Sequence, residues 1–367
     1  MNIDLSRPLG KLQGLLVAVL LVAVTFFVAL IVKHAPHAPL ESAVRLNTSG
    51  IGDVQVEGEN IFYIEAGSLH CVSSSGDFKW NVSVDKNSRF RVSSKGVAVW
   101  YGSRVRIIDI KTGLVRGTPS VSGNILSAVV GDVFAAVVIG PEHNSRVLLT
   151  DLNGNTVDEL TEFADVTVLD CGFFEGRELF WIMTLDSTGS LPCCKISTFK
   201  PGKRETGSIT DMEQVIYKVM FRSNYICAVG TDYMRVYDYH GTEQTSQRTM
   251  VYGWYLENVG VSADDPLMLF VPNSQAGETM AIKDIRCIKG GEERMLHVPV
   301  SCSQLIGFGN TIYGFSSNRL AVANYPNSSS NVYALPLNVN EVIGITTDRT
   351  AVVVSGNSIY MIKLPAN

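Results

Sequence analysis

Beyond residue 40 the chain alternates short apolar runs with turn signals over its whole length. The runs are rich in Val, Ile, Phe and Tyr, and they either alternate with polar residues or are wholly apolar, which is the pattern of β-strands. No segment in this part shows the spacing of an amphipathic helix. The pattern predicts an all-β domain over residues 41–367.

The strands recur in a fixed order. The clearest unit covers residues 89–117 and reads FRVSS, GVAVWYG, SRVRIIDIKTG and LVRG, which predicts three strands and the start of a fourth. Other copies show an apolar strand, a turn and a second strand; they cover residues 61–80, 133–151, 225–241 and 350–364. The domain is therefore predicted to be built from repeats.

Many of these second strands end in a common turn signal. It reads DIKTG at residues 109–113, DLNG at 151–154, DYHG at 238–241 and, in a weaker form, SSSG at 73–76. Asp at the first position of a turn accepts hydrogen bonds from local amides, and Gly supplies the positive φ that the return requires. Each signal predicts a tight connection to a further strand.

The repeat length indicates the architecture. Adjacent copies recur at about 40 residues, the period of four-stranded β-propeller blades. The chain shows seven such units and a last one, residues 342–364, with only three strands, while residues 42–46 form a stray strand-like segment. Pairing the two would close the ring and remove exposed sheet edges. We expect eight blades, with seven as the alternative; a pair of irregular β-sandwiches or a β-solenoid fits the repeats less well.

The N-terminal part has a different character. Residues 14–32 form an uncharged apolar run that, as a helix, rises about 28 Å and matches the hydrocarbon core of a bilayer. Arg7 and Lys11 precede it, so the positive-inside bias places the N-terminus in the cytoplasm. The prediction is a cytoplasmic tail over residues 1–13, one transmembrane helix over 14–32, a Pro-rich spacer over 33–40 and an exported domain over 41–367.

A cleaved signal peptide is the rival interpretation of the same run. Its apolar region would be shorter, and the one Ala-x-x-Ala stretch, residues 35–38, is followed by Pro39, which disfavours cleavage. No cysteine lies just beyond the run, which argues against lipid attachment there. We therefore expect a single-pass protein of the cytoplasmic membrane, held in the lipid bilayer by residues 14–32.

Composition narrows the classes of function. The net charge is −5 without a long basic run, which gives no reason to expect a nucleic acid partner. The seven cysteines are scattered and lack metal-ligand spacing; they are Cys71, Cys171, Cys193, Cys194, Cys227, Cys287 and Cys302. They suggest no disulfide framework and no metal site.

The turn-centred repeats resemble those of quinoprotein-type (PQQ-like) propellers, whose blades carry an Asp-x-x-Thr-Gly-like turn and a tryptophan. Asp109, Thr112 and Gly113 match one copy, and Gly76 with Trp80 matches the end of another. The organisation resembles uncharacterised membrane-anchored propeller proteins of Gram-positive bacteria, a resemblance that implies no reaction. The scaffold is also similar to that of the outer-membrane assembly lipoprotein, an eight-bladed protein-binding module, although this chain has an anchor in place of a lipidation cysteine.

Few residues suggest catalysis. Quinoprotein dehydrogenases keep adjacent cysteines near their cofactor, and Cys193 and Cys194 are such a pair, but the alternative is a hairpin strand on which they point to opposite faces. Asp264 and Asp265 precede a proline and read as turn residues. The histidines lie in different repeats without a repeated partner. We predict no catalytic residue, no metal and no cofactor.

The remaining hypothesis is binding. Loops on rigid propeller strands suit the recognition of a protein, peptide or glycan at the cell envelope, so a non-catalytic binding or scaffold module is the leading expectation. Tyr252, Trp254 and Tyr255 would form an interface hot spot if they lie on a rim, whereas burial between blades is the alternative. A quinone-dependent or other enzyme with a site in the propeller channel, and an extracytoplasmic sensor, are the other hypotheses.

Overall fold

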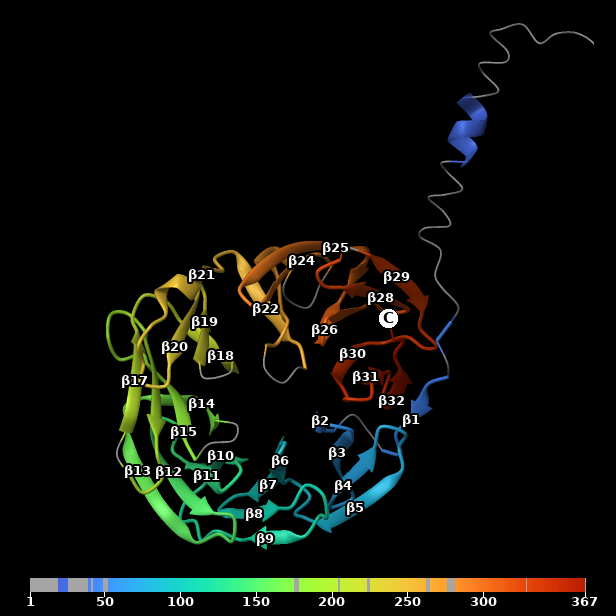
Figure 1. The fold of residues 1–367 in the computed structure, drawn as a ribbon. Helices are drawn as coiled ribbons and strands as arrows, with labels where there is room; N and C mark the ends of the chain where they lie inside the picture. Colours follow the sequence, from blue (N-terminus) through green and yellow to red (C-terminus); the bar gives the residue numbers. More distant parts are fainter. Residues whose placement is uncertain are drawn as a thin grey trace, which may run out of the picture.

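The protein is described by a computed structural model that covers residues 19–25, 39–40, 42–48, 52–174, 178–203, 205–222, 225–261, 265–275, 281–327 and 329–366. The described residues form eight four-stranded antiparallel sheets, arranged as a ring (Figure 1). The fold is an eight-bladed β-propeller, which confirms the predicted fold class and the preferred number of blades.

The blades follow one another along the chain (Figure 1). In blades 1 to 7 the first strand lies nearest the centre of the ring, and in the last blade, whose outer strand comes from the start of the domain, the inner strand is β30. Blades 1 to 4 consist of β2 (Val54–Glu57), β3 (Asn60–Glu65), β4 (Ser68–Ser73) and β5 (Phe78–Ser83); β6 (Arg89–Ser93), β7 (Gly96–Tyr101), β8 (Arg104–Ile108) and β9 (Val115–Gly117); β10 (Ile125–Val130), β11 (Phe134–Ile139), β12 (Asn144–Asp151) and β13 (Thr156–Ala164); β14 (Thr167–Phe173), β15 (Phe180–Asp186), β16 (Cys193–Phe199) and β17 (Glu205–Asp211).

The second half of the ring repeats this arrangement. Blades 5 to 8 consist of β18 (Ile216–Arg222), β19 (Tyr225–Gly230), β20 (Tyr233–Asp238) and β21 (Thr249–Met250); β22 (Trp254–Val259), β23 (Met268–Pro272), β24 (Ile282–Lys289) and β25 (Glu292–Cys302); β26 (Gln304–Phe308), β27 (Thr311–Phe315), β28 (Arg319–Asn324) and β29 (Ser330–Ala334); β30 (Glu341–Ile345), β31 (Thr350–Ser355), β32 (Ser358–Lys363) and β1 (Val44–Arg45). Two short 3-10 turns, η1 (Thr245–Gln247) and η2 (Asn273–Gln275), lie in blades 5 and 6.

The last blade joins the two ends of the domain. Its outer strand is β1, in which Val44 pairs with Met361 and Arg45 with Tyr360 of β32. Leu46, next along the chain, is buried between blades 8 and 1. The predicted pairing of residues 42–46 with the three-stranded final unit is therefore confirmed, and it closes the ring.

The core lies between neighbouring blades. Each of eight apolar clusters takes its side chains from two adjacent blades, as when Phe62 and Trp80 of blade 1 pack with Val97 and Ile108 of blade 2. The apolar strands predicted from the sequence bury both faces in this way, which explains why many of them do not alternate with polar residues. The free energy of burial is thus distributed around the ring.

The predicted turns fasten one blade to the next. Asp109 accepts hydrogen bonds from the amides of Lys111 and Thr112, and Gly113 has a φ of 72°. The indole of Trp80, from blade 1, packs on this turn of blade 2 and donates from Nε1 to the carbonyl of Ile110 at 3.1 Å. A Cβ at Gly113 would lie 2.6 Å from the Trp80 ring, so the contact requires glycine.

The innermost strands are also linked to one another through side chains. Gln55 Nε2 donates to the carbonyl of Phe90 at 2.8 Å, and Asn258 Oδ1 accepts from the amide of Gly307 at 3.0 Å. Gln304 Oε1 accepts in the same way from the next inner strand. These links fix the inner strands, so groups that project from them are held on a rigid frame.

The predicted membrane segment is described only in part. Residues 19–25 form a helix, while residues 14–18 and 26–32, the tail over 1–13 and most of the spacer lie outside the described residues. Among the residues that are described, no helix has the length and apolar character needed to cross a membrane. Leu40, where the predicted spacer ends, donates its amide to the carbonyl of Ala334 in blade 7.

Candidate functional site

Candidate sites lie at the two ends of the channel that the inner strands surround. Each blade has four antiparallel strands, so the outer strand ends at the rim where the next inner strand begins. We call this the amino-end rim, and we call the opposite rim, where the inner strands end, the carboxyl-end rim. Loops on propeller rims are the usual location of binding residues.

Five inner strands carry an extra residue near the amino-end rim. The register of β10, β14, β18, β22 and β30 shifts at Leu126, Leu169, Tyr217, Glu257 and Ile343. A bulge of this kind re-aims the side chain that it carries and is common beside functional sites. Three of the five bulge residues line cavities in the channel, as described below.

The three aromatic residues singled out in the sequence lie at the amino-end rim but have different surroundings. Tyr252 lies in the loop between β21 and β22 and is 74% exposed. Tyr255, in β22, is 43% exposed. Trp254 is partly buried, packs against the core between blades 5 and 6, and has the Arg286 guanidinium 5.8 Å from its ring centroid. The structure thus presents two tyrosines at the rim and uses the tryptophan as support.

Arg286 holds this support in place. Its guanidinium binds both carboxylate oxygens of Glu293, at 2.8 and 2.7 Å, and donates to the carbonyl of Met250 at 2.7 Å. A bidentate pair is geometrically specific. Because Met250 directly precedes the loop that carries Tyr252, this arrangement fixes the base of the loop.

Tyr255 pairs with a second tyrosine at the mouth of the channel. Its ring stacks on that of Tyr217, with centroids 5.5 Å apart and an interplanar angle of 11°. The Tyr217 hydroxyl accepts a hydrogen bond from the amide of Leu256 at 3.1 Å, which joins blades 5 and 6. Together with Lys218 and Glu257, these rings line a cavity of about 330 Å³.

Glu257 is the carboxylate of this part of the channel. Burial raises the pKa of its carboxyl group, and a hydrogen bond from the backbone of Leu305 opposes the shift. Glu257 also lines a second cavity of about 320 Å³, whose other walls are mainly apolar and include Ile343 and Val56. Since these residues come from β22, β30 and β2, this cavity lies within the ring and extends the mouth inward.

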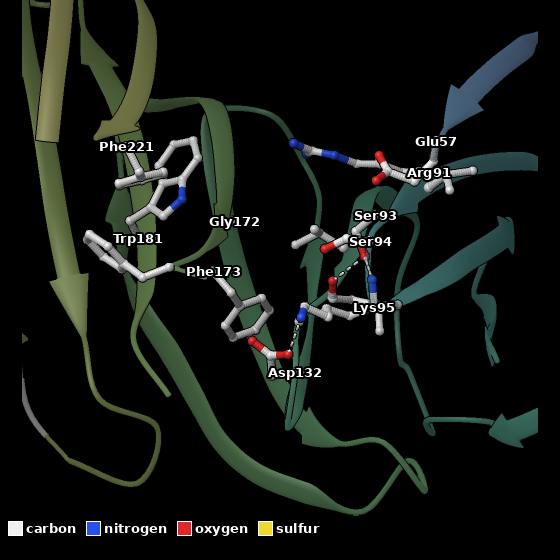
Figure 2. Close-up of a pocket in the computed structure, with 15 residues that line it drawn as sticks. Glu57, Arg91, Ser93, Ser94, Lys95, Asp132, Gly172, Phe173, Trp181 and Phe221 are labelled. Carbon is white, nitrogen blue, oxygen red and sulfur yellow. Dashed lines mark hydrogen bonds and ion pairs between the residues drawn. The ribbon is translucent and has the colours of Figure 1, made fainter. Parts of the chain in front are cut away.

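A third cavity, of about 240 Å³, opens at the carboxyl-end rim among blades 1 to 5 (Figure 2). One wall is aromatic: Phe173 ends β14, Phe221 lies in β18, and Trp181 lies in β15 behind the inner strand. The Trp181 and Phe221 rings are 5.3 Å apart. Phe173 and Phe221 are partly exposed, so their rings face the cavity.

The opposite wall carries the charged side chains of Glu57, Arg91 and Lys95. Arg91 binds Asp170 at 3.0 Å, across the intervening inner strand of blade 3, and Lys95 binds Asp132 at 2.9 Å. Figure 2 shows Arg91 and Lys95 on the side of the cavity away from Trp181. The cavity therefore combines an aromatic wall with charged groups, two of which form ion pairs.

Among the described residues, those considered for catalysis lie in several different blades. Cys194 is buried and Cys193 partly exposed at the start of β16, so the two thiols point to opposite faces, as the hairpin interpretation predicts. His70, His143 and His240 lie in blades 1, 3 and 5, each with a different partner. In the described part of the chain, no three His, Cys, Asp or Glu side chains are placed to hold a metal ion. Asp264 lies outside the described residues.

The cavity at the carboxyl-end rim is not predicted from the sequence. Its aromatic residues come from three separate strands, and each strand reads as ordinary core. The one local signal is the pair Phe173 and Phe174 at the end of an apolar strand, directly before polar residues. Only the ring geometry brings this pair to Phe221 and Lys95.

The comparisons with known proteins show the fold. No family model matches the chain, and no curated protein is similar to it in sequence. Sqt1 of Saccharomyces cerevisiae has a similar structure, with a TM-score of 0.58 and 9% identity over 90% of this chain and 100% of that one. BamB of Moraxella catarrhalis has a TM-score of 0.54 and 10% identity over 89% of this chain and 99% of that one. At such identities the likeness defines the class, a β-propeller, and nothing finer.

Proposed function

We propose that this protein is a non-catalytic binding module, anchored in the cytoplasmic membrane by residues 14–32, that captures an envelope protein, peptide or glycan at the amino-end rim of its propeller. The observation that carries the proposal is the exposure of Tyr252 and Tyr255 beside the mouth of the channel. Tyrosine is enriched at interface hot spots because it buries a large ring and offers a hydroxyl at little cost in entropy.

The surroundings of the two tyrosines support this role. Leu191, Met212 and Met250 are also exposed at the amino-end rim, on blades 4 and 5. Interface centres are rich in aromatic residues and Met, and poor in charged residues. Tyr255 also lines the cavity that contains Tyr217 and Glu257, so a partner that covers the two exposed tyrosines can insert a side chain into the channel.

The side chains that support the two tyrosines favour binding with little rearrangement. Trp254 and Arg286 support the loop from below, and the stacked pair of Tyr217 and Tyr255 holds one ring in position. Preorganised side chains lose less conformational entropy when a partner binds. Tight recognition is therefore compatible with a small number of contact residues.

Partner recovery from the native membrane tests the proposal. The tagged full-length chain is crosslinked in its host and purified, and the recovered proteins are compared with those from a Tyr252→Ala/Tyr255→Ala double variant. Removal of two hot-spot residues predicts at least a tenfold loss of a specific partner, since each such residue contributes about 2 kcal/mol or more. Phe78→Ala, which removes an exposed ring from outer strand β5, is the matched control. Equal recovery from the double variant and wild type would refute the proposed site.

A further inference from the structure

Glu257 places a carboxyl group inside the mouth of the channel. The extra residue in β22 turns this side chain away from the sheet, so that it lines both the cavity at the mouth and the cavity further inward. Among the described residues, no lysine or arginine forms an ion pair with it, and the backbone N–H of Leu305 is the one group that stabilises its charged form. The carboxylate is therefore partly desolvated without a compensating cation.

A cation supplied by a ligand would provide this compensation. A carboxylate has about four acceptor positions on its two oxygens, and a charge that is removed from water is stabilised when it is paired. The cavities that Glu257 lines measure about 330 and 320 Å³, so space for a ligand lies beside the carboxylate. A metal ion needs several such groups, and in the described part of the chain no three His, Cys, Asp or Glu side chains are placed to hold one.

Lys218 is the other charged residue that lines these two cavities. Its side chain is exposed, so its charge is solvated by water and screened by salt. Burial raises the pKa of the Glu257 carboxyl group, which shows that Glu257 is the less solvated of the two charges. A charged ligand therefore interacts more strongly with Glu257 than with Lys218, and the mouth favours a cation, which Lys218 weakly repels.

The remaining walls suit an aliphatic chain. The stacked rings of Tyr217 and Tyr255 line the mouth beside Glu257, and the inner cavity is lined mainly by Val, Leu and Ile. Lysine and arginine side chains bury their methylene groups along apolar surface while the charged end remains bound to polar groups. A basic side chain thus matches both the carboxylate and the apolar walls.

The rim beside the mouth indicates where such a side chain comes from. Tyr255 is 43% exposed at the amino-end rim and also lines the mouth, so a partner that covers the exposed tyrosines lies directly over the cavity. We propose that the mouth is a subsite for a basic side chain, lysine or arginine, of the captured protein or peptide, and that its cationic end binds the carboxylate of Glu257. This inference rests on the proposed function and narrows the chemistry of the partner.

Binding of short peptides to the full-length protein in nanodiscs tests the inference. The tyrosine rings are labelled with 13C, and Tyr255→Phe assigns the Tyr255 signal. Millimolar Ac-Gly-Lys-Gly-NH2 is expected to shift this signal in a saturable way. The same peptide with norleucine keeps the methylene chain but lacks the ammonium group, and it should bind about tenfold more weakly because the charge-assisted contact is lost. Ac-Gly-Glu-Gly-NH2 should cause no shift.

Three variants locate the effect. Glu257→Gln should weaken binding of the lysine peptide about tenfold, and Lys218→Met should strengthen it because a competing positive charge is removed. Glu341→Gln is the matched control: it removes an exposed carboxylate from the start of inner strand β30 at the same rim and should leave binding unchanged. Since the ionised carboxylate is the binding form, the affinity of the wild type should fall as the pH is lowered and Glu257 takes up a proton. Glu257→Gln should abolish this dependence.

Equal affinity for the lysine and norleucine peptides would overturn the inference, as would equal effects of Glu257→Gln and Glu341→Gln. Weaker binding of the lysine peptide to Lys218→Met would also contradict it, because that result would assign the mouth to an anion. The proposed function would survive each of these results if partner recovery still depended on Tyr252 and Tyr255.

Discussion

Val44 lies directly opposite Met361 in the antiparallel pair that joins the two ends of the propeller. The residues are separated by almost the whole domain in sequence, yet they share one blade. Because β1 follows closely after the predicted anchor, the segment that is predicted to leave the membrane is also the segment that closes the ring. The predicted anchor and β1 are therefore neighbouring segments that can be deleted separately.

Truncation separates the two. A chain that begins at residue 49 lacks β1 and Leu46, which is 2% exposed between blades 8 and 1. Burial of one leucine contributes about 1.5–3 kcal/mol, so we expect the free energy of unfolding to fall by more than about 2 kcal/mol. Urea denaturation followed by circular dichroism measures the change. A chain that begins at residue 39 keeps β1 and serves as control; equal stability of the two chains would disprove this role of β1.

The contact between Trp80 and Gly113 makes a second prediction. Gly113→Ala places a Cβ 2.6 Å from the indole and a side chain at positive φ. The backbone effect is roughly 1–2 kcal/mol, and overpacking adds roughly 1–3 kcal/mol. Gly102→Ala, in the same blade at a φ of 57° with no atom within 4 Å of the added Cβ, carries only the first effect. The Tm of Gly113→Ala should therefore be lower than that of Gly102→Ala. The reverse order would show that the turn adjusts to the added methyl group without a steric penalty.

Asp348 makes stability depend on pH. Burial raises the pKa of its carboxyl group, but hydrogen bonds from Thr346, Lys363 and Ser74 outweigh burial and lower the pKa to about 2. Since the folded pKa is below the unfolded value, the stabilisation is present above about pH 4 and is lost as the pH falls toward 2. It amounts to at most about 2 kcal/mol. Asp348→Asn should lower the free energy of unfolding at pH 7 and reduce its dependence on pH between 4 and 2. If the variant loses as much stability as the wild type between pH 4 and 2, Asp348 is not the source of this pH dependence.

The buried ion pair between Asp211 and Arg235 is expected to contribute to the stability of the propeller. Asp211 is 1% exposed, its Oδ2 lies 3.4 Å from Arg235 Nη1, and it also accepts from Gln214 Nε2 at 3.0 Å. Asp211→Ala leaves Glu213 as the remaining carboxylate partner of Arg235, but it removes the acceptor of the buried Gln214 amide, and a lost buried hydrogen bond of this kind costs about 1–3 kcal/mol. Asp211→Ala should lose that much in urea denaturation. Glu178→Ala, which breaks an exposed pair 3.7 Å from Lys200, should lose under about 1 kcal/mol; comparable losses would contradict the assignment.

The membrane anchor remains a prediction from the sequence. Residues 14–32 should keep the full-length chain in the membrane fraction after an alkaline carbonate wash, and deletion of residues 1–33 should release it. With the N-terminus inside, protease added to intact cells should remove a tag placed after residue 367. Release of the full-length chain by carbonate, or protection of the tag, would refute the topology.

The blades could be predicted because their determinants are local. Asp109 and Gly113 mark a turn through their own backbone requirements, and the three strands of the final unit leave one place to fill, which residues 42–46 occupy. Such signals need no knowledge of which blades are neighbours. The candidate sites depend on that knowledge, because Tyr217 contacts Tyr255, and Phe174 contacts Phe221, only where neighbouring blades pack together.

The bulges explain another part of what the sequence conceals. A residue such as Glu257 follows an apolar strand start and reads as one polar position in an alternating pattern. In the structure an extra residue in β22 turns it into the channel. Because the direction of every later side chain in a strand depends on such single insertions, alternation alone does not assign inner-strand residues to the channel or to the core.

The most direct test of the account is site-specific photo-crosslinking in living cells. A photoreactive phenylalanine analogue replaces Tyr252 in one full-length chain and Phe78, the exposed ring of outer strand β5, in another. Partner binding at the amino-end rim predicts a discrete covalent adduct from position 252 and none from position 78. An adduct from position 78 alone, or no adduct from position 252 under conditions where a partner is recovered, would contradict the central claim that this rim is the binding surface.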